Sequence, residues 1–141
     1  MTHNFKFSTE IAVTVGDINY GGHLGNDRLL SLFQEARLRY LQQFNCSELS
    51  IGDDTSLIMS QAHVNFKAEA FWGDQLTIFV RISRIEKIRF LFEYLIVKTD
   101  QPQKIIATGH TQMVGFDYHH RKVKKLPLSF VQTIKAYESV N

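Results

Sequence analysis

The hydrophobic period of this chain differs between segments, and this difference limits the fold more than any other feature. From Asp27 to Phe44 apolar residues recur every three or four positions, which predicts one amphipathic helix. After about residue 56 apolar and polar residues alternate instead, as in half-buried β-strands. A similar alternation runs from Phe5 to Val15. The expected order is therefore one strand, one helix and then four or five strands.

Polar segments separate the later strands. The separating segments are Trp72–Asp74, Glu86–Lys87 and Asp100–Pro102, and such short links predict antiparallel neighbours. Pro127 predicts a terminal helix from about Leu128 to Val140, after a hairpin turn at 117–121.

The helix after the glycine-rich segment is unusually apolar. Asn26 is expected to cap its first turn. Leu30 and Leu38 widen its apolar face and predict deep burial. One such helix beside one antiparallel sheet predicts an α+β fold in which the sheet wraps around the helix. A sheet of this kind leaves an edge or a face to be covered, which favours a homodimer.

Composition excludes several classes of protein. The chain has 141 residues and no repeat or linker, so we expect a single domain over residues 1–141. A net charge of +2 argues against a nucleic-acid partner, and the lack of a long apolar run argues against a membrane partner. The single cysteine, Cys46, and the absence of a visible secretory signal predict a cytoplasmic location.

Four glycines fall within Gly16–Gly25, a loop that must adopt unusual backbone angles or approach another group closely. This loop and the following Gln34–Arg37 segment resemble those of hotdog-fold acyl-CoA thioesterases of the 4-hydroxybenzoyl-CoA thioesterase type. His63–Leu76 is similar to the strand–turn–strand segment of that family, and Ile106–Pro127 to its closing strand. The resemblance covers roughly residues 5 to 127.

The resemblance implies a hotdog fold, in which a curved antiparallel sheet wraps a long central helix. It also implies a dimer or a dimer of dimers with active sites between subunits. The implied reaction is hydrolysis of an acyl-CoA thioester without a metal, and without a cofactor other than the coenzyme A of the substrate. Backbone N–H groups of Gly22, His23 or Leu24 would hold the carbonyl oxygen near the helix start.

Many relatives carry a carboxylate four residues before the histidine of this motif, but this chain has Asn19 there. An amide is not a base, although it can orient water or polarise a carbonyl. The expected catalytic carboxylate is therefore Asp17 or Glu35, with Asn19 and His23 shaping the site. Each of these four residues also has a purely structural interpretation. Asp17, Asn19 and His23 could simply brace the loop. Glu35 could form an ion pair with Arg37 or Arg39.

Substrate contacts are expected at two further places. Phe66 is a candidate for the acyl pocket, and Asn26 for the helix-start part of the site. The phosphates of coenzyme A need cations, for which Arg84, Lys87 and Arg89 are candidates, although charged surface residues are usually just solvated. The six histidines show no metal-ligand spacing, so no metal site is expected.

Asn19 also leaves a second function open, a non-catalytic module that binds or senses acyl-CoA on the same fold. A dehydratase acting on an acyl-carrier-protein substrate fits less well, because its catalytic histidine motif is not apparent.

Overall fold

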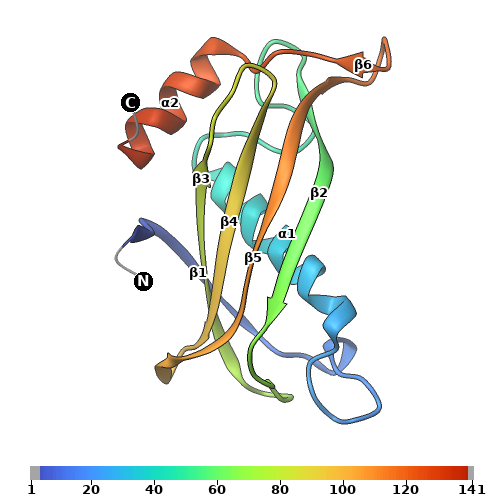
Figure 1. Ribbon diagram of the computed structural model, residues 1–141, viewed down its shortest axis with the longest axis vertical. Helices are drawn as coiled ribbons and strands as arrows, with labels where there is room; N and C mark the ends of the chain where they lie inside the picture. The colour runs from blue at the N-terminus through green and yellow to red at the C-terminus, as the bar shows by residue number, and fades with distance from the viewer. Residues whose placement is uncertain (1–3, 140–141) are drawn as a thin grey trace.

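The computed structural model describes residues 4–139 and shows an antiparallel sheet curved around one long helix (Figure 1). The strands are β1 (Phe7–Ala12), β2 (Ser56–Phe66), β3 (Gln75–Ser83), β4 (Arg89–Lys98), β5 (Gln101–Asp117) and β6 (Lys122–Val123). The helices are α1 (Leu29–Gln42) and α2 (Leu128–Glu138), with 3₁₀ turns η2 (Val15–Asp17) and η3 (Asn26–Arg28). The predicted α+β hotdog architecture is confirmed. Among the residues described, no helix has the length and hydrophobicity needed to cross a bilayer.

The sheet order is β1-β3-β4-β5-β2, with every pair antiparallel and β6 added to β5. The expectation that the Trp72–Asp74 link joins neighbouring strands is wrong, because β2 pairs with β5 while β3 lies between β1 and β4. Backbone bonds explain the difference. Lys67 N–H bonds to Ile106 O at 3.0 Å at one end of the link, and Gly73 N–H to Val13 O at 3.0 Å at the other. The segment therefore crosses the end of the sheet instead of turning back on itself.

One face of α1 packs against the sheet. The ring of Phe33 stacks on that of Tyr94 with centroids 4.1 Å apart. Beneath it lies Gly109, where a Cβ would stand 2.5 Å from His63 O and 2.7 Å from Phe33 Cε2. Only glycine allows the helix so close to β5. The face pressed on the sheet consists of Leu29, Leu32, Phe33, Ala36, Arg37, Tyr40 and Leu41.

The opposite face of α1 is open. Leu30 and Leu38 are 39% and 37% exposed, so the prediction of deep burial drawn from these two residues is wrong. The sheet of one chain covers α1 from one side only. These two leucines lie on the uncovered side.

The predicted N-cap is also wrong. Asn26 is the first residue of η3, and no side-chain cap bond is made there. Gly25 occupies the N-cap position of the turn instead. Its carbonyl accepts Arg28 N–H at 3.0 Å, and its own N–H bonds to Asp17 O at 2.9 Å. The terminal helix begins at Leu128 as predicted and ends at Glu138, whereas Val140 lies outside the described residues.

Candidate active site

A pocket of about 280 Å³ lies where the start of α1 meets the end of β2. Figure 1 shows the two elements meeting at the lower end of the sheet. We call it the helix-start pocket. Four residues expected from the sequence, His23, Leu24, Asn26 and Phe66, are brought together there. The complete lining is His23, Leu24, Asn26, Leu29, Phe66, Lys67, Ala68, Glu69 and Ile106.

The glycine-rich loop folds back on itself to form one wall of this pocket. Asn19 N–H bonds to His23 O at 3.0 Å, and Gly22 N–H to Asn19 O at 3.0 Å. Gly22 has a φ of +80°, which favours glycine at this position. Leu24 N–H then bonds to Ala70 O at 2.7 Å, which attaches the loop to the segment after β2.

These bonds decide which of the expected N–H groups are free to hold a carbonyl oxygen. The N–H groups of Gly22 and Leu24 already have backbone acceptors. Within residues 4–139, the N–H groups of His23 and Asn26 have none, and both residues line the pocket. The Asn26 amide was missed in the sequence because the residue was interpreted as a cap that acts through its side chain.

Asp17 lies inside the loop, buried, and is not part of the pocket lining. Its Oδ2 accepts hydrogen bonds from Thr14 N–H and Thr14 Oγ1, both at 2.9 Å. Its Oδ1 lies 3.5 Å from the Arg28 guanidinium. These contacts are the loop-bracing geometry that stood as the alternative to a catalytic role.

Asn19 and His23 also bond to the loop backbone. The Oδ1 of Asn19 accepts Gly21 N–H at 2.9 Å, which closes an Asx turn. The Nδ1 of His23 lies 3.1 Å from Leu24 O, so the tautomer with a proton on Nδ1 donates there and leaves Nε2 as an acceptor. Of the two residues, only His23 lines the pocket.

Glu35 lies on the exposed side of α1 and does not line the helix-start pocket. It forms an ion pair with Arg39 at 2.9 Å, one of the two partners considered from the sequence. Arg37 instead pairs with Glu48 at 3.2 Å. Arg39 also donates to Thr9 Oγ1 at 2.7 Å, which joins this pair to β1.

The predicted phosphate-binding cations are not at this pocket within one chain. Arg84, Lys87 and Arg89 lie at or near the turn between β3 and β4, at the opposite end of the sheet from the start of α1 (Figure 1). Arg89 Nε lies 4.0 Å from a carboxylate oxygen of Glu86.

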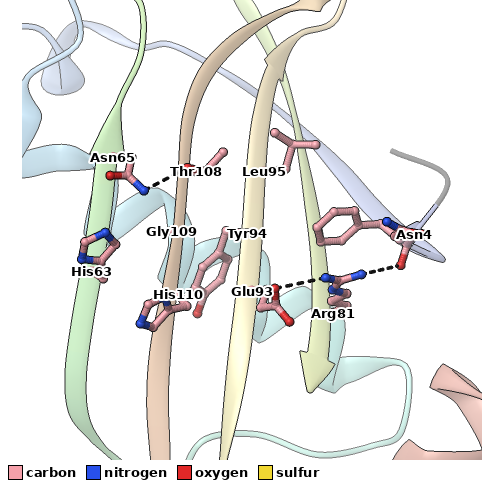
Figure 2. A pocket seen from close by; sticks show the side chains of 11 residues that line it. Asn4, His63, Asn65, Arg81, Glu93, Tyr94, Leu95, Thr108, Gly109 and His110 are labelled. Carbon is pink, nitrogen blue, oxygen red and sulfur yellow. Dashed lines mark hydrogen bonds and ion pairs between the residues drawn. The ribbon is translucent and has the colours of Figure 1, made fainter. Parts of the chain in front are cut away.

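A second hollow, of about 260 Å³, lies on the face of the sheet away from α1 (Figure 2). His63 and His110 stack across β2 and β5 with centroids 5.2 Å apart. Glu93 lies opposite His110 on the neighbouring strand β4, which continues this row across the sheet, and it accepts a 3.1 Å hydrogen bond from Arg81. Burial acts to raise the pKa of Glu93, but the hydrogen bond from Arg81, the neighbouring Ser83 hydroxyl and the charges of Arg81 and Arg84 together outweigh burial and lower it. We call this hollow the outer-face pocket.

The sequence pattern did not single out the outer-face pocket. Its row depends on register, which pairs His63 with His110 and His110 with Glu93. Alternation showed only that these side chains share the polar side of their strands. No group of three or more histidine, cysteine or acidic side chains suited to a metal occurs within residues 4–139.

Comparison with known proteins identifies the family. The model of the thioesterase-like superfamily matches residues 13–134, which include both walls of the helix-start pocket. The chain belongs to the thioesterase-like superfamily. Thioester hydrolysis is the reaction class of this thioesterase-like chain, as the sequence predicted.

Solved structures share the fold along nearly the whole chain. A 1,4-dihydroxy-2-naphthoyl-CoA thioesterase from Synechocystis has a TM-score of 0.81 and 26% identity, covering 92% of this chain and 95% of that one. A Staphylococcus aureus protein in complex with CoA has a TM-score of 0.82 and 21% identity, covering 94% and 84%. A DHNA-CoA thioesterase from S. aureus has a TM-score of 0.80 and 19% identity, covering 94% and 88%. The last two show likeness of fold alone.

Proposed function

We propose that this chain hydrolyses acyl-CoA thioesters in the helix-start pocket, with a carboxylate and no metal. One observation carries the proposal: His23 and Asn26, from the loop and η3, meet Phe66 at the end of β2 around a single pocket. The Synechocystis neighbour, named as a thioesterase for an aromatic CoA ester, supports a CoA ester as the substrate.

In this proposal different walls of the pocket bind the thioester oxygen and the acyl group. The N–H groups of His23 and Asn26 hold the thioester oxygen as negative charge develops on it. Leu29, Phe66 and Ile106 provide the apolar surface for the acyl group. A volume of about 280 Å³ is at the small end of ligand pockets, which favours a compact acyl group over a long chain.

A second copy of the chain is part of the proposal, because β2 ends the sheet and leaves one edge unpaired. Ile58, Met59 and Phe66 on this strand are exposed. Antiparallel pairing of two β2 strands would place the Phe66 end of one copy beside the Ile58 end of the other. Two such dimers could associate further.

That pairing would give the distant cations a role. Arg89 pairs with Val114, and Val114 pairs with Ile58, so Arg89 lies in the Ile58 row, two strands from the edge. Adjacent strands are about 4.8 Å apart, so Arg89 of the second copy would lie about 10 Å from the shared edge. Arg84, Lys87 and Arg89 could then meet the phosphates of a CoA bound in the first copy's pocket.

A binding module without turnover is the second candidate, and Asn19 favours it. The amide occupies the position where relatives carry a carboxylate, and its oxygen is already bonded to Gly21 N–H. It therefore supplies no base at that position, and one of the two lone pairs of its oxygen is used within the loop.

The deciding experiment is thiol release from short, medium, long and aromatic acyl-CoA esters, combined with calorimetry of CoA binding. Turnover with compact esters would support the proposal. Binding without release from any ester would favour the binding module. Neither binding nor release would overturn both.

A further inference from the structure

We propose that Glu69 is the carboxylate that activates water in the helix-start pocket. This inference rests on the proposed function and deepens it. It assigns the base to a residue that no sequence motif indicates, in place of Asp17 or Glu35.

The location of Glu69 is the first argument. Among the described residues that line the helix-start pocket, Glu69 alone carries a carboxylate. It shares the lining with His23 and Asn26, whose N–H groups are without acceptors in the part of the chain described. Asp17 and Glu35 line neither this pocket nor the outer-face pocket.

The second argument is that the backbone on both sides of Glu69 is fixed. The N–H groups of Lys67 and Ala68 both bond to Ile106 O, at 3.0 and 3.2 Å. On the other side, Ala70 O accepts Leu24 N–H at 2.7 Å. Glu69 is therefore held between β5 and the glycine-rich loop, on a segment with little freedom to move away from the pocket.

The third argument is availability, because the other carboxylates considered are already engaged. Asp17 accepts from Thr14 and faces Arg28, Glu35 pairs with Arg39, and Glu93 in the outer-face pocket pairs with Arg81. Within residues 4–139, no hydrogen bond or ion pair involves the Glu69 carboxylate. It is exposed and free to accept a hydrogen bond from water.

The proposed step balances as follows. The Glu69 carboxylate takes one proton from water while the water oxygen bonds to the thioester carbon. The carbonyl π electrons move to its oxygen, which the His23 and Asn26 N–H groups stabilise. When the C=O bond re-forms, the C–S bond breaks and its electron pair leaves with sulfur. The sulfur takes the proton from Glu69, so the products are a free acid and the coenzyme A thiol.

Glu69→Gln is the test, assayed with the acyl-CoA ester that the wild-type protein hydrolyses fastest. We expect kcat to fall by about 100-fold or more, the lower end of the range for a general base. KM should change little, and the part of the pH profile in which the rate rises with pH should be lost. Glu69→Asp, which keeps the carboxylate, should retain part of the activity.

Glu10→Gln is the matched control, because Glu10 is an exposed carboxylate on β1 outside the pocket. It should leave kcat and the pH profile unchanged. Thermal unfolding of all three variants should match the wild type, since both positions are exposed. Full activity of Glu69→Gln beside an active wild type would overturn the assignment alone. An inactive wild type that fails on every ester would overturn the proposed function, and the assignment with it.

Discussion

The hydroxyl of Tyr40 on α1 donates a 2.6 Å hydrogen bond to Oε2 of Glu138 on α2. The same carboxylate oxygen accepts Ile82 N–H of β3 at 3.1 Å. Burial, reinforced by the bond to Glu138, raises the pKa of Tyr40 well above its usual value, so the phenol stays protonated and acts as the donor. Two helices and one strand are therefore joined at a single oxygen.

Tyr40→Phe should destabilise the protein while leaving the fold intact. The ring and its edge contacts with Phe7 and Phe92 remain, but a hydrogen bond to a charged acceptor is lost. Such bonds contribute about 1.5–3 kcal/mol, so urea unfolding should show a loss of that size. Tyr118→Phe, at an exposed position, should cost no more than about 0.5 kcal/mol. Equal effects of the two changes would contradict this account.

Gly109→Ala should also destabilise the protein, by crowding. The added methyl group would meet His63 O and the Phe33 ring, so β5 and α1 would have to separate. Overpacking of this kind costs about 1–3 kcal/mol. Gly16→Ala is the matched control, since a Cβ added there would meet no atom within 4 Å and its φ is not positive. The difference between the two should appear in the free energy of unfolding, and no difference would refute the close-contact argument.

Asp117 should titrate unusually low. The hydrogen bond with His120, together with backbone N–H donors of the same turn, lowers the pKa of Asp117 from 3.8 to about 2. The folded pKa lies below the unfolded one, so the interaction stabilises the turn at neutral pH and is lost as pH falls from about 4 to about 2. NMR titration should show the low value, and His120→Ala should raise it. An unchanged pKa in that variant would exclude His120 as the main cause.

Asp17→Asn and Glu35→Gln separate bracing from catalysis. If Glu69 is the base, Asp17→Asn should weaken the bonds to Thr14 and Arg28 and lower the free energy of unfolding by about 1–3 kcal/mol. Its kcat should stay far closer to the wild type than that of Glu69→Gln. Glu35→Gln should change both quantities little, because an exposed ion pair contributes at most about 1 kcal/mol. Loss of turnover in either variant, with folding intact, would return the catalytic role to that residue.

Local patterns predicted most of the elements but not their partners. The helix and the strands follow from periods of 3.6 and 2, which neighbouring residues alone determine. The place of β2 beside β5 does not, because that pairing joins Phe66 to Ala107 and depends on the whole sheet. The exposure of Leu30 and Leu38 likewise depends on how far the sheet curves, which no local window contains.

The site shows the same division. The glycine-rich motif singled out His23 and Asn26, and both line the helix-start pocket because they belong to one continuous segment. Asp17 belongs to that segment too, yet its contacts with Thr14 and Arg28 are visible only in three dimensions. Glu69 was missed because the alternation of apolar and polar residues runs on past Phe66, where β2 ends, and includes Glu69 among the ordinary polar surface residues. The bonds of Lys67 and Ala68 to Ile106 O and of Leu24 to Ala70 O, which join distant parts of the chain, bring it to the pocket.

The position of β2 at the sheet edge has a consequence for the growing chain. The helix-start pocket combines residues near positions 23–29, 66–69 and 106, and the last of these belongs to β5. Most of the chain must therefore leave the ribosome before the pocket can form, even though the glycine-rich loop of the pocket emerges early. Contacts this distant in sequence also slow folding. We expect pocket formation and completion of the sheet to be one kinetic event, so that recovery of ligand binding during refolding reports on β2–β5 pairing.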